Sequence, residues 1–334
     1  MKLHENIALF KQAVRFTAQQ KGILDIYIEK DYWVTLALFT IFKNNIGKET
    51  IFKGGTALSK CNHLIDRFSE DIDLVILRKD RETNNQLKTK LKKISKCVES
   101  VIPEIHIDEI TNKMGMIRKT AHNYDKNFDN DFGQIRDIVI IESSWLGNFE
   151  PYSKGIVSSF IYEMMIQTNQ LDIIEEYNIN PFEVLVLSPK RTLCEKIMSL
   201  VRCSYTKEPI NDLRLKIRHA YDIHMILKDT EFRGFFNSEK FDYMLLKVAN
   251  DDALSFKSNN EWLSNHPTKA IIFSDTKNIW NEIKTTYENE FKRLVFGEFP
   301  NETEIMNTLI TVANRLKEFE WDIQVKIVKQ QNEL

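Results

Sequence analysis

Hydrophobic and polar residues alternate with two different periods in the first half of the chain. A helical spacing of i, i+3, i+4, i+7 and i+8 predicts a helix over residues 29–44. Its stripe consists of Trp33, Leu36, Ala37, Thr40 and Ile41. Short apolar runs then predict strands at 51–53 and at "DIDLVIL" (71–77), with a helix near 55–64 between them and a basic helix near 81–100.

Three further extended stretches follow that basic helix. They are "EIHIDEI" (104–110), "MGMIRKTAH" (114–122) and "DIVIIESSW" (137–145). Helices interleaved with strands, followed by several strands in a row, favour a mixed sheet over a doubly wound parallel one. The fold class expected for this part is therefore α+β.

The pattern changes after "FEVLVLSP", because almost every readable period from Lys190 to the end is helical. We therefore expect a mixed-sheet domain over residues 1–187 and a mainly helical domain over residues 188–334. The chain has no Gly/Ser-rich linker, so we expect the domains to pack closely and a crevice between them to hold the functional site.

Composition is that of an ordinary globular protein, with 334 residues of which 43% are hydrophobic. The longest apolar run, "YWVTLALFTIF", is shorter than the roughly 20 residues of a membrane span, and the N-terminus lacks a signal-peptide core. These features favour a cytoplasmic protein without a membrane partner. The four cysteines show no CxxC spacing, which favours reduced thiols over structural zinc.

The net charge of −2 conceals two basic stretches. Residues 78–96 hold eight basic and two acidic residues, and residues 190–218 hold eight basic and three acidic residues. Either stretch could face a polyanion such as RNA, or could be the solvated side of a helix.

Two consecutive glycines stand between a predicted strand and a predicted helix in "FKGGTALSK" (52–60). Gly54 and Gly55 thus indicate a tight turn whose backbone N–H groups could hold an anion, although an ordinary strand-to-helix turn has the same pattern. Lys53, Lys60 and Arg67 lie near this turn in the sequence and could either neutralise phosphate or face solvent.

Two aspartates head the strand that follows, in "RFSEDIDLVI" (67–76). Alternate residues of a strand share a face, so Asp71 and Asp73 should project together and repel one another unless a divalent cation lies between them. Carboxylate oxygens suit Mg²⁺ or Mn²⁺. Glu142, at the end of "DIVIIE", is the candidate third acid of a two-metal site, or it marks the exit of its strand into solvent.

The helical half offers two more candidates. Lys196 lies at the edge of an apolar helical stripe, where it could reach a crevice or merely extend its ammonium group to solvent. Arg218 and Asp222 are four residues apart and could be a simple helical ion pair.

Taken together, these motifs resemble the DNA polymerase β superfamily of nucleotidyltransferases, and its AbiEii/AbiGii toxin branch in particular. The resemblance rests on five motifs that span residues 29–223: "EKDYWV", "FKGGTALSK", "RFSEDIDL", "PKRTLCEKI" and "RHAYDI". Among the alternatives, a glycosyltransferase also uses a DxD motif, but the upstream glycine pair and the third strand carboxylate favour a nucleotidyltransferase. A nucleotide-binding or antitoxin-binding module without activity remains the non-enzymatic alternative.

The resemblance implies roles for individual residues. Gly54, Gly55 and Ser69 would hold the triphosphate of an NTP, and Asp71, Asp73 and Glu142 would bind Mg²⁺ or Mn²⁺. Lys196 would contact nucleotide phosphate, and Asp222 would be the acidic residue of the last motif.

The activity implied is transfer of a nucleoside monophosphate from an NTP to an acceptor, with release of pyrophosphate. The family acts as the toxin of type IV-like toxin–antitoxin or phage abortive-infection systems, which implies an antitoxin partner. The acceptor would be a cellular RNA, with the 3′ end of tRNA as the leading candidate, or a protein hydroxyl.

Overall fold

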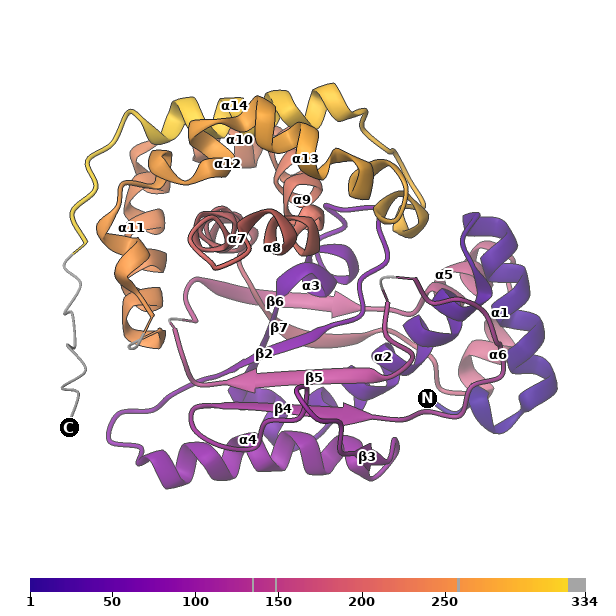
Figure 1. Cartoon of the computed structure of the whole chain (residues 1–334). Coiled ribbons are helices and arrows are strands. Elements are labelled where there is room, and N and C mark those ends of the chain that lie inside the picture. The colour runs from indigo at the N-terminus through magenta and orange to yellow at the C-terminus, as the bar shows by residue number, and fades with distance from the viewer. Residues whose placement is uncertain (134, 148, 257–258, 324–334) are drawn as a thin grey trace. The chain divides into compact units, whose positions relative to one another are not determined.

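The computed structural model describes residues 1–133, 135–147, 149–256 and 259–323 (Figure 1). The chain forms two compact units. The first consists of Met1–Trp145, Pro151–Leu187 and Arg293–Glu298, and the second consists of Leu146–Glu150, Ser188–Lys292 and the chain from Phe299 onward.

Seven strands of the first unit form one mixed sheet. The strands are β1 (Thr50–Lys53), β2 (Ile72–Ile76), β3 (Glu104–Ile105), β4 (Ile117–His122), β5 (Val139–Ser144), β6 (Tyr152–Val157) and β7 (Phe182–Leu187). Their order across the sheet is β3-β4-β5-β2-β1-β7-β6. The pairs β1/β7 and β2/β5 are parallel and the other four pairs are antiparallel, which confirms the predicted mixed sheet.

The strands follow the hydrophobic pattern closely where they are buried. Ile72, Leu74 and Ile76 of β2 are buried while Asp73 is only partly so, as the alternation predicts. The sequence did not indicate β6, because four of its six residues are exposed and its pattern carries no apolar alternation. The stretch 104–110, expected to be extended, pairs only over Glu104–Ile105.

Six α-helices belong to the described part of the first unit. They are α1 (Ile7–Lys21), α2 (Asp25–Lys43), α3 (Gly54–Lys60), α4 (Asn84–Glu99), α5 (Phe160–Gln167) and α6 (Leu171–Glu176). Helices α2 and α4 pack against each other and against the sheet, while α1 packs on α2 and α5 (Figure 1).

The residues at one end of α1 and of α4 explain where these helices stop or start. Helix α1 ends at Gly22 in the left-handed region, and α4 begins with a capping box of Thr83 and Gln86.

The described part of the second unit is built from helices, as predicted. They are α7 (Pro189–Cys203), α8 (Pro209–Leu215), α9 (Ile217–Lys228), α10 (Thr230–Phe236), α11 (Glu239–Ser255), α12 (Ile271–Ser274), α13 (Thr276–Glu288) and α14 (Glu302–Leu316). Helix α7 is the centre of this unit and contacts α8, α9, α11 and α12 (Figure 1).

Two other expectations concern membranes and cysteines. Within the described residues, every helix is too short or too polar to span a bilayer. All four cysteines are free thiols, as expected, and Cys194 and Cys203 are buried.

Candidate active site

The glycine pair lies where β1 passes into α3. Gly54 has a φ of 80°, which residues other than glycine rarely adopt. A Cβ atom on Gly54 would lie less than 3.0 Å from the Asp73 carboxylate, and one on Gly55 would lie 2.6 Å from Nη2 of Arg67. Glycine is favoured at Gly54 by this positive φ, and at both positions because a carboxylate or a guanidinium group lies against the backbone.

Hydrogen bonds attach this turn to the segment that carries the aspartates. The hydroxyl of Thr56, in the first turn of α3, donates to the carbonyl oxygen of Asp71 at 2.6 Å. The same hydroxyl lies 3.0 Å from Oγ of Ser69, which is buried. Ser69 also lies beside Gly55, since a Cβ on that glycine would be 3.0 Å from its Oγ. The structure thus brings Gly54, Gly55, Ser69, Asp71 and Asp73 together at one end of β2.

A row of four charged residues crosses the middle of the sheet. Lys53 pairs with Asp73 across β1 and β2, Asp73 with Glu142 across β2 and β5, and Glu142 with Lys119 across β5 and β4. Residues directly opposite each other in a ladder share a face, so two acids lie side by side between two bases. This register places Glu142 next to Asp73.

Glu142 itself is not a buried carboxylate. Its strand is interior, but its side chain is 42% exposed and forms a 3.2 Å ion pair with Lys119. Burial therefore does not require a cation at Glu142, because water and Lys119 already stabilise the charge. Its place beside Asp73 is what keeps it a candidate.

The donor set can be compared with the needs of a divalent cation. Among the residues that the structure describes, no three His, Cys, Asp or Glu side chains are grouped so as to hold a metal ion. Mg²⁺, however, usually binds one or two protein carboxylates and completes its shell with water and substrate phosphates. Asp73, on β2, and Asp71, one residue before β2 begins, supply two hard oxygen donors close together in the chain, and the absence of a side chain at Gly54 lets the Asp73 carboxylate lie against the glycine turn. These residues fit Mg²⁺ or Mn²⁺ in that mode.

The candidates of the helical half meet one another in the second unit. Nζ of Lys196, on α7, lies 2.6 Å from Oδ2 of Asp222, on α9, and the two side chains are only 6% and 0% exposed. Nδ1 of His219 lies 3.5 Å from the same ammonium group. Lys196 is thus buried in an ion pair instead of extending to solvent.

Sequence reasoning missed a set of buried charges at the start of α2. Glu29, Lys30 and Asp31 are all buried, and Asp31 forms a 2.6 Å ion pair with Lys60. Burial raises the pKa of Glu29 and of Asp31 and lowers the pKa of Lys30. Lys60 therefore does not face solvent, and its ammonium group is directed at Asp31.

The chain was compared with protein families, solved structures and curated proteins. The family model described as "Nucleotidyl transferase AbiEii toxin, Type IV TA system" matches residues 36–323. Among solved structures, the chain is similar to MenT4, a nucleotidyltransferase toxin from Mycobacterium tuberculosis H37Rv. The two are 13% identical with a TM-score of 0.46, over 90% of this chain and 98% of that one. The comparison with curated proteins found no match.

The family match covers most of the chain, including the glycine turn, the aspartate strand and the Lys196–Asp222 pair. It agrees with the resemblance drawn from the motifs. The chain therefore belongs to the AbiEii family of nucleotidyltransferase toxins of type IV toxin–antitoxin systems.

Proposed function

We propose that this protein transfers a nucleoside monophosphate from an NTP to a hydroxyl group of a cellular RNA, with the 3′ end of tRNA as the leading acceptor. The observation that carries the proposal is the contact between the glycine turn and the aspartate strand, where Gly54 lies against the Asp73 carboxylate. Membership of a toxin–antitoxin family implies an antitoxin as a further partner.

The residues of the first unit have separate roles in this proposal. Gly54, Gly55 and Ser69 border the space that the triphosphate would occupy, and Asp71 and Asp73 would hold Mg²⁺ or Mn²⁺. The bound cation would supply charge neutralisation on the transferring phosphoryl group. Asp71 and Asp73 would position that cation, and the acceptor oxygen would form its bond to the α-phosphorus as the bond from that phosphorus to pyrophosphate breaks.

Glu142 is the proposed third acid. It lies beside Asp73 in the ladder, and its ion pair with Lys119 is partly exposed. Exposed ion pairs contribute little to stability, about 0–1 kcal/mol, so Glu142 could leave Lys119 for a cation at small cost.

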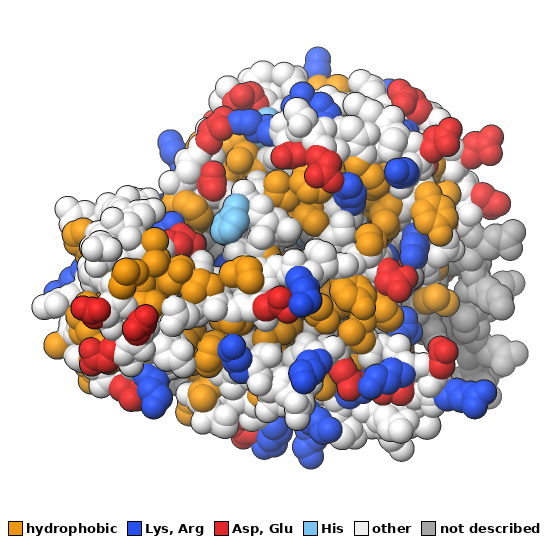
Figure 2. All heavy atoms as spheres, turned by 180° about the vertical axis from the view of Figure 1, so that it is seen from behind, with side chains coloured by type: hydrophobic (Ala, Val, Ile, Leu, Met, Phe, Trp, Pro, Cys, Tyr) orange, Lys and Arg blue, Asp and Glu red, His pale blue; other side chains and the backbone are white. Residues whose placement is uncertain are grey.

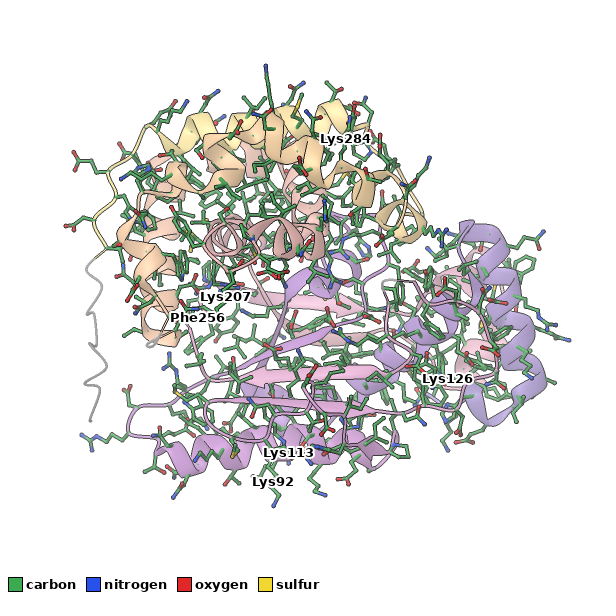
Figure 3. The ribbon with its side chains drawn as sticks, viewed as in Figure 1. Lys92, Lys113, Lys126, Lys207, Phe256 and Lys284 are labelled. Atoms are coloured by element: carbon green, nitrogen blue, oxygen red, sulfur yellow. The ribbon has the colours of Figure 1, made fainter. Side chains whose placement is uncertain are left out.

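Lysines on α4 support an RNA acceptor. They form an exposed row that we call the α4 lysine face: Lys88, Lys92, Lys93 and Lys96. Figure 3 shows Lys92 pointing away from the sheet, and basic side chains line the lower rim of Figure 2, the side on which Figure 1 places α4. Ion pairs occur in both basic stretches, including Lys190 with Glu231 at 2.7 Å and Lys96 with Glu99 at 2.5 Å. The α4 lysine face is the proposed site of phosphate contacts because its lysines are exposed along one helix.

The proposal is tested by incubating the purified protein with each labelled NTP, Mg²⁺ and total RNA. We expect one NTP to label an RNA band, and Asp71→Asn or Asp73→Asn to abolish the label while the fold persists. Either variant should even gain stability without metal, because it removes repulsion between the two carboxylates. Label in the protein fraction instead would identify a protein hydroxyl as the acceptor. No label with any NTP, or full activity of either variant, would refute the proposal.

A further inference from the structure

Three consecutive charged residues in the second turn of α2 are all buried and contact different segments of the first unit. Successive residues of a helix point about 100° apart, so Glu29, Lys30 and Asp31 cannot share one partner. Glu29 accepts hydrogen bonds from the backbone N–H groups of Asn127 and Phe128 at 2.8 and 3.3 Å. The other two form buried ion pairs.

The Lys30 pair lies directly beside the aspartate strand. Its ammonium group contacts the carboxylate of Glu70 and also donates to the carbonyl oxygen of Arg136. The second oxygen of Glu70 accepts from the N–H of Arg136 at 3.3 Å. Glu70 immediately precedes Asp71, whose carbonyl oxygen is held by Thr56 of the glycine turn. The backbone at 70–71 is thus fixed from both sides.

The charges of Lys30 and Glu70 also affect the electrostatic potential at Asp71. The Asp71 carboxylate acts electrostatically on both Lys30 and Glu70. The opposite charges of the pair largely cancel at Asp71, whereas either one alone would shift the potential at that carboxylate. An uncompensated Lys30 cation would oppose the binding of a second cation there.

We propose that Lys30 and Glu70 are positioning residues of the nucleotidyltransferase site, which fix the Asp71 carboxylate and cancel the charge beside it so that Asp71 can bind the divalent cation of the metal–NTP complex. This inference rests on the proposed function. The two residues touch neither substrate nor cation and act through Asp71.

The Asp31–Lys60 pair is a matched control. It is as deeply buried, and Asp31 also accepts a hydrogen bond from the N–H of Phe160 at 2.8 Å. It fixes the end of α3 to the loop before α5, because Lys60 donates to the carbonyl oxygen of Ser158 at 3.0 Å. Breaking it should destabilise the fold without changing the charge beside Asp71.

The experiment compares the full-length wild type with Glu70→Gln, with Lys30→Met/Glu70→Gln and with the control Asp31→Asn. Mn²⁺ is titrated calorimetrically in the presence of non-hydrolysable analogues of the four NTPs, and kcat and KM for transfer are measured beside it. Glutamine keeps the size of Glu70 but leaves the Lys30 charge uncompensated, so we expect Mn²⁺ affinity to fall about tenfold or more. Asp31→Asn should melt earlier and bind Mn²⁺ within about twofold of wild type.

The double variant Lys30→Met/Glu70→Gln separates the effect of the pair's charges on Asp71 from its effect on the position of residues 70–71. It restores a neutral environment without leaving a buried unpaired charge, so Mn²⁺ affinity should return to within about threefold of wild type. It also removes the contacts that fix residues 70–71, so kcat should stay well below that of Asp31→Asn while KM for the NTP changes little.

Two results would overturn the inference: wild-type Mn²⁺ affinity in a folded Glu70→Gln variant, or wild-type kcat in the double variant. If Glu70→Gln does not fold, the double variant decides. A wild type that binds Mn²⁺ with an NTP analogue but labels no acceptor would refute the proposed function alone, and the Mn²⁺ titrations would still judge the role of the pair. A wild type that binds no Mn²⁺ with any analogue would overturn both.

Discussion

Replacing Gly54 by alanine tests the central contact of the candidate site. At a φ of 80° alanine costs about 1–2 kcal/mol relative to glycine. Its methyl group would also occupy the position of the Asp73 carboxylate, and moving that side chain off its preferred rotamer costs about 0.5–1.5 kcal/mol more. The free energy of unfolding should therefore fall by about 1.5–3.5 kcal/mol, which lowers Tm by roughly 3–14 °C in a unit of this size.

Gly22 provides a control with the same backbone and no neighbour. Its φ is 68°, and a Cβ built there would meet no atom within 4 Å. Gly22→Ala should lose only the backbone part, about 1–2 kcal/mol. Both substitutions change the unfolded chain equally, so their difference isolates the contact with Asp73.

The assay combines thermal unfolding, followed by circular dichroism, with transfer from a labelled NTP. Gly54→Ala should melt below Gly22→Ala and lose transfer, because the displaced Asp73 can no longer hold the cation. Equal melting of the two variants, together with normal transfer by Gly54→Ala, would refute the reasoning.

Four further predictions concern the proposed chemistry. Glu142→Gln should change stability by less than about 1 kcal/mol, since its ion pair is partly exposed, yet abolish transfer if Glu142 is the third acid; normal turnover would remove it from the site. Changing the α4 lysine face to glutamine should weaken RNA binding and flatten its salt dependence, and an unchanged slope in filter-binding titrations would mean that α4 is only solvated. Lys196→Ala should lower kcat by about 100-fold. The control Arg202→Ala removes a cation–π contact with Phe256 and should change kcat little, and equal kcat values for the two variants would exclude a role of Lys196 in phosphate binding. Lys196→Ala should also destabilise the second unit by about 3–5 kcal/mol, because it removes the buried ammonium group that pairs with Asp222, and Lys196→Met/Asp222→Asn should restore much of that stability in denaturant titrations but no transfer.

The local features of the site were readable from the sequence. The glycine pair and the two aspartates each have a signature that acts over a few residues: a turn that needs a positive φ, and a strand whose alternate positions share a face. The structure places Gly54 and Asp73 in contact. The register that brings Glu142 beside Asp73 comes from the parallel pairing of β2 with β5, which the prediction of a mixed sheet did not specify.

Contacts between distant segments were not readable in the same way. The pairing of Lys196 with Asp222 depends on how α7 and α9 pack, whereas the sequence pattern suggested for Asp222 a helical ion pair with Arg218. Strand β6 was missed because an exposed edge strand needs no apolar alternation, so nothing in "YSKGIV" distinguishes it from a loop.

The buried charges of α2 fall between these two cases. The run "YWVTLALFTIF" that follows Asp31 has no polar face, and a helix that is hydrophobic all round must be buried on every side. Charged residues just before it in the same helix are therefore expected to be buried as well, and a buried charge must be paired. The existence of partners for Lys30 and Asp31 was thus deducible from the sequence, whereas their identity was not. Glu70 and Lys60 lie 40 and 29 residues away, and only the packing of α2 against the end of α3 and the segment just before β2 selects them.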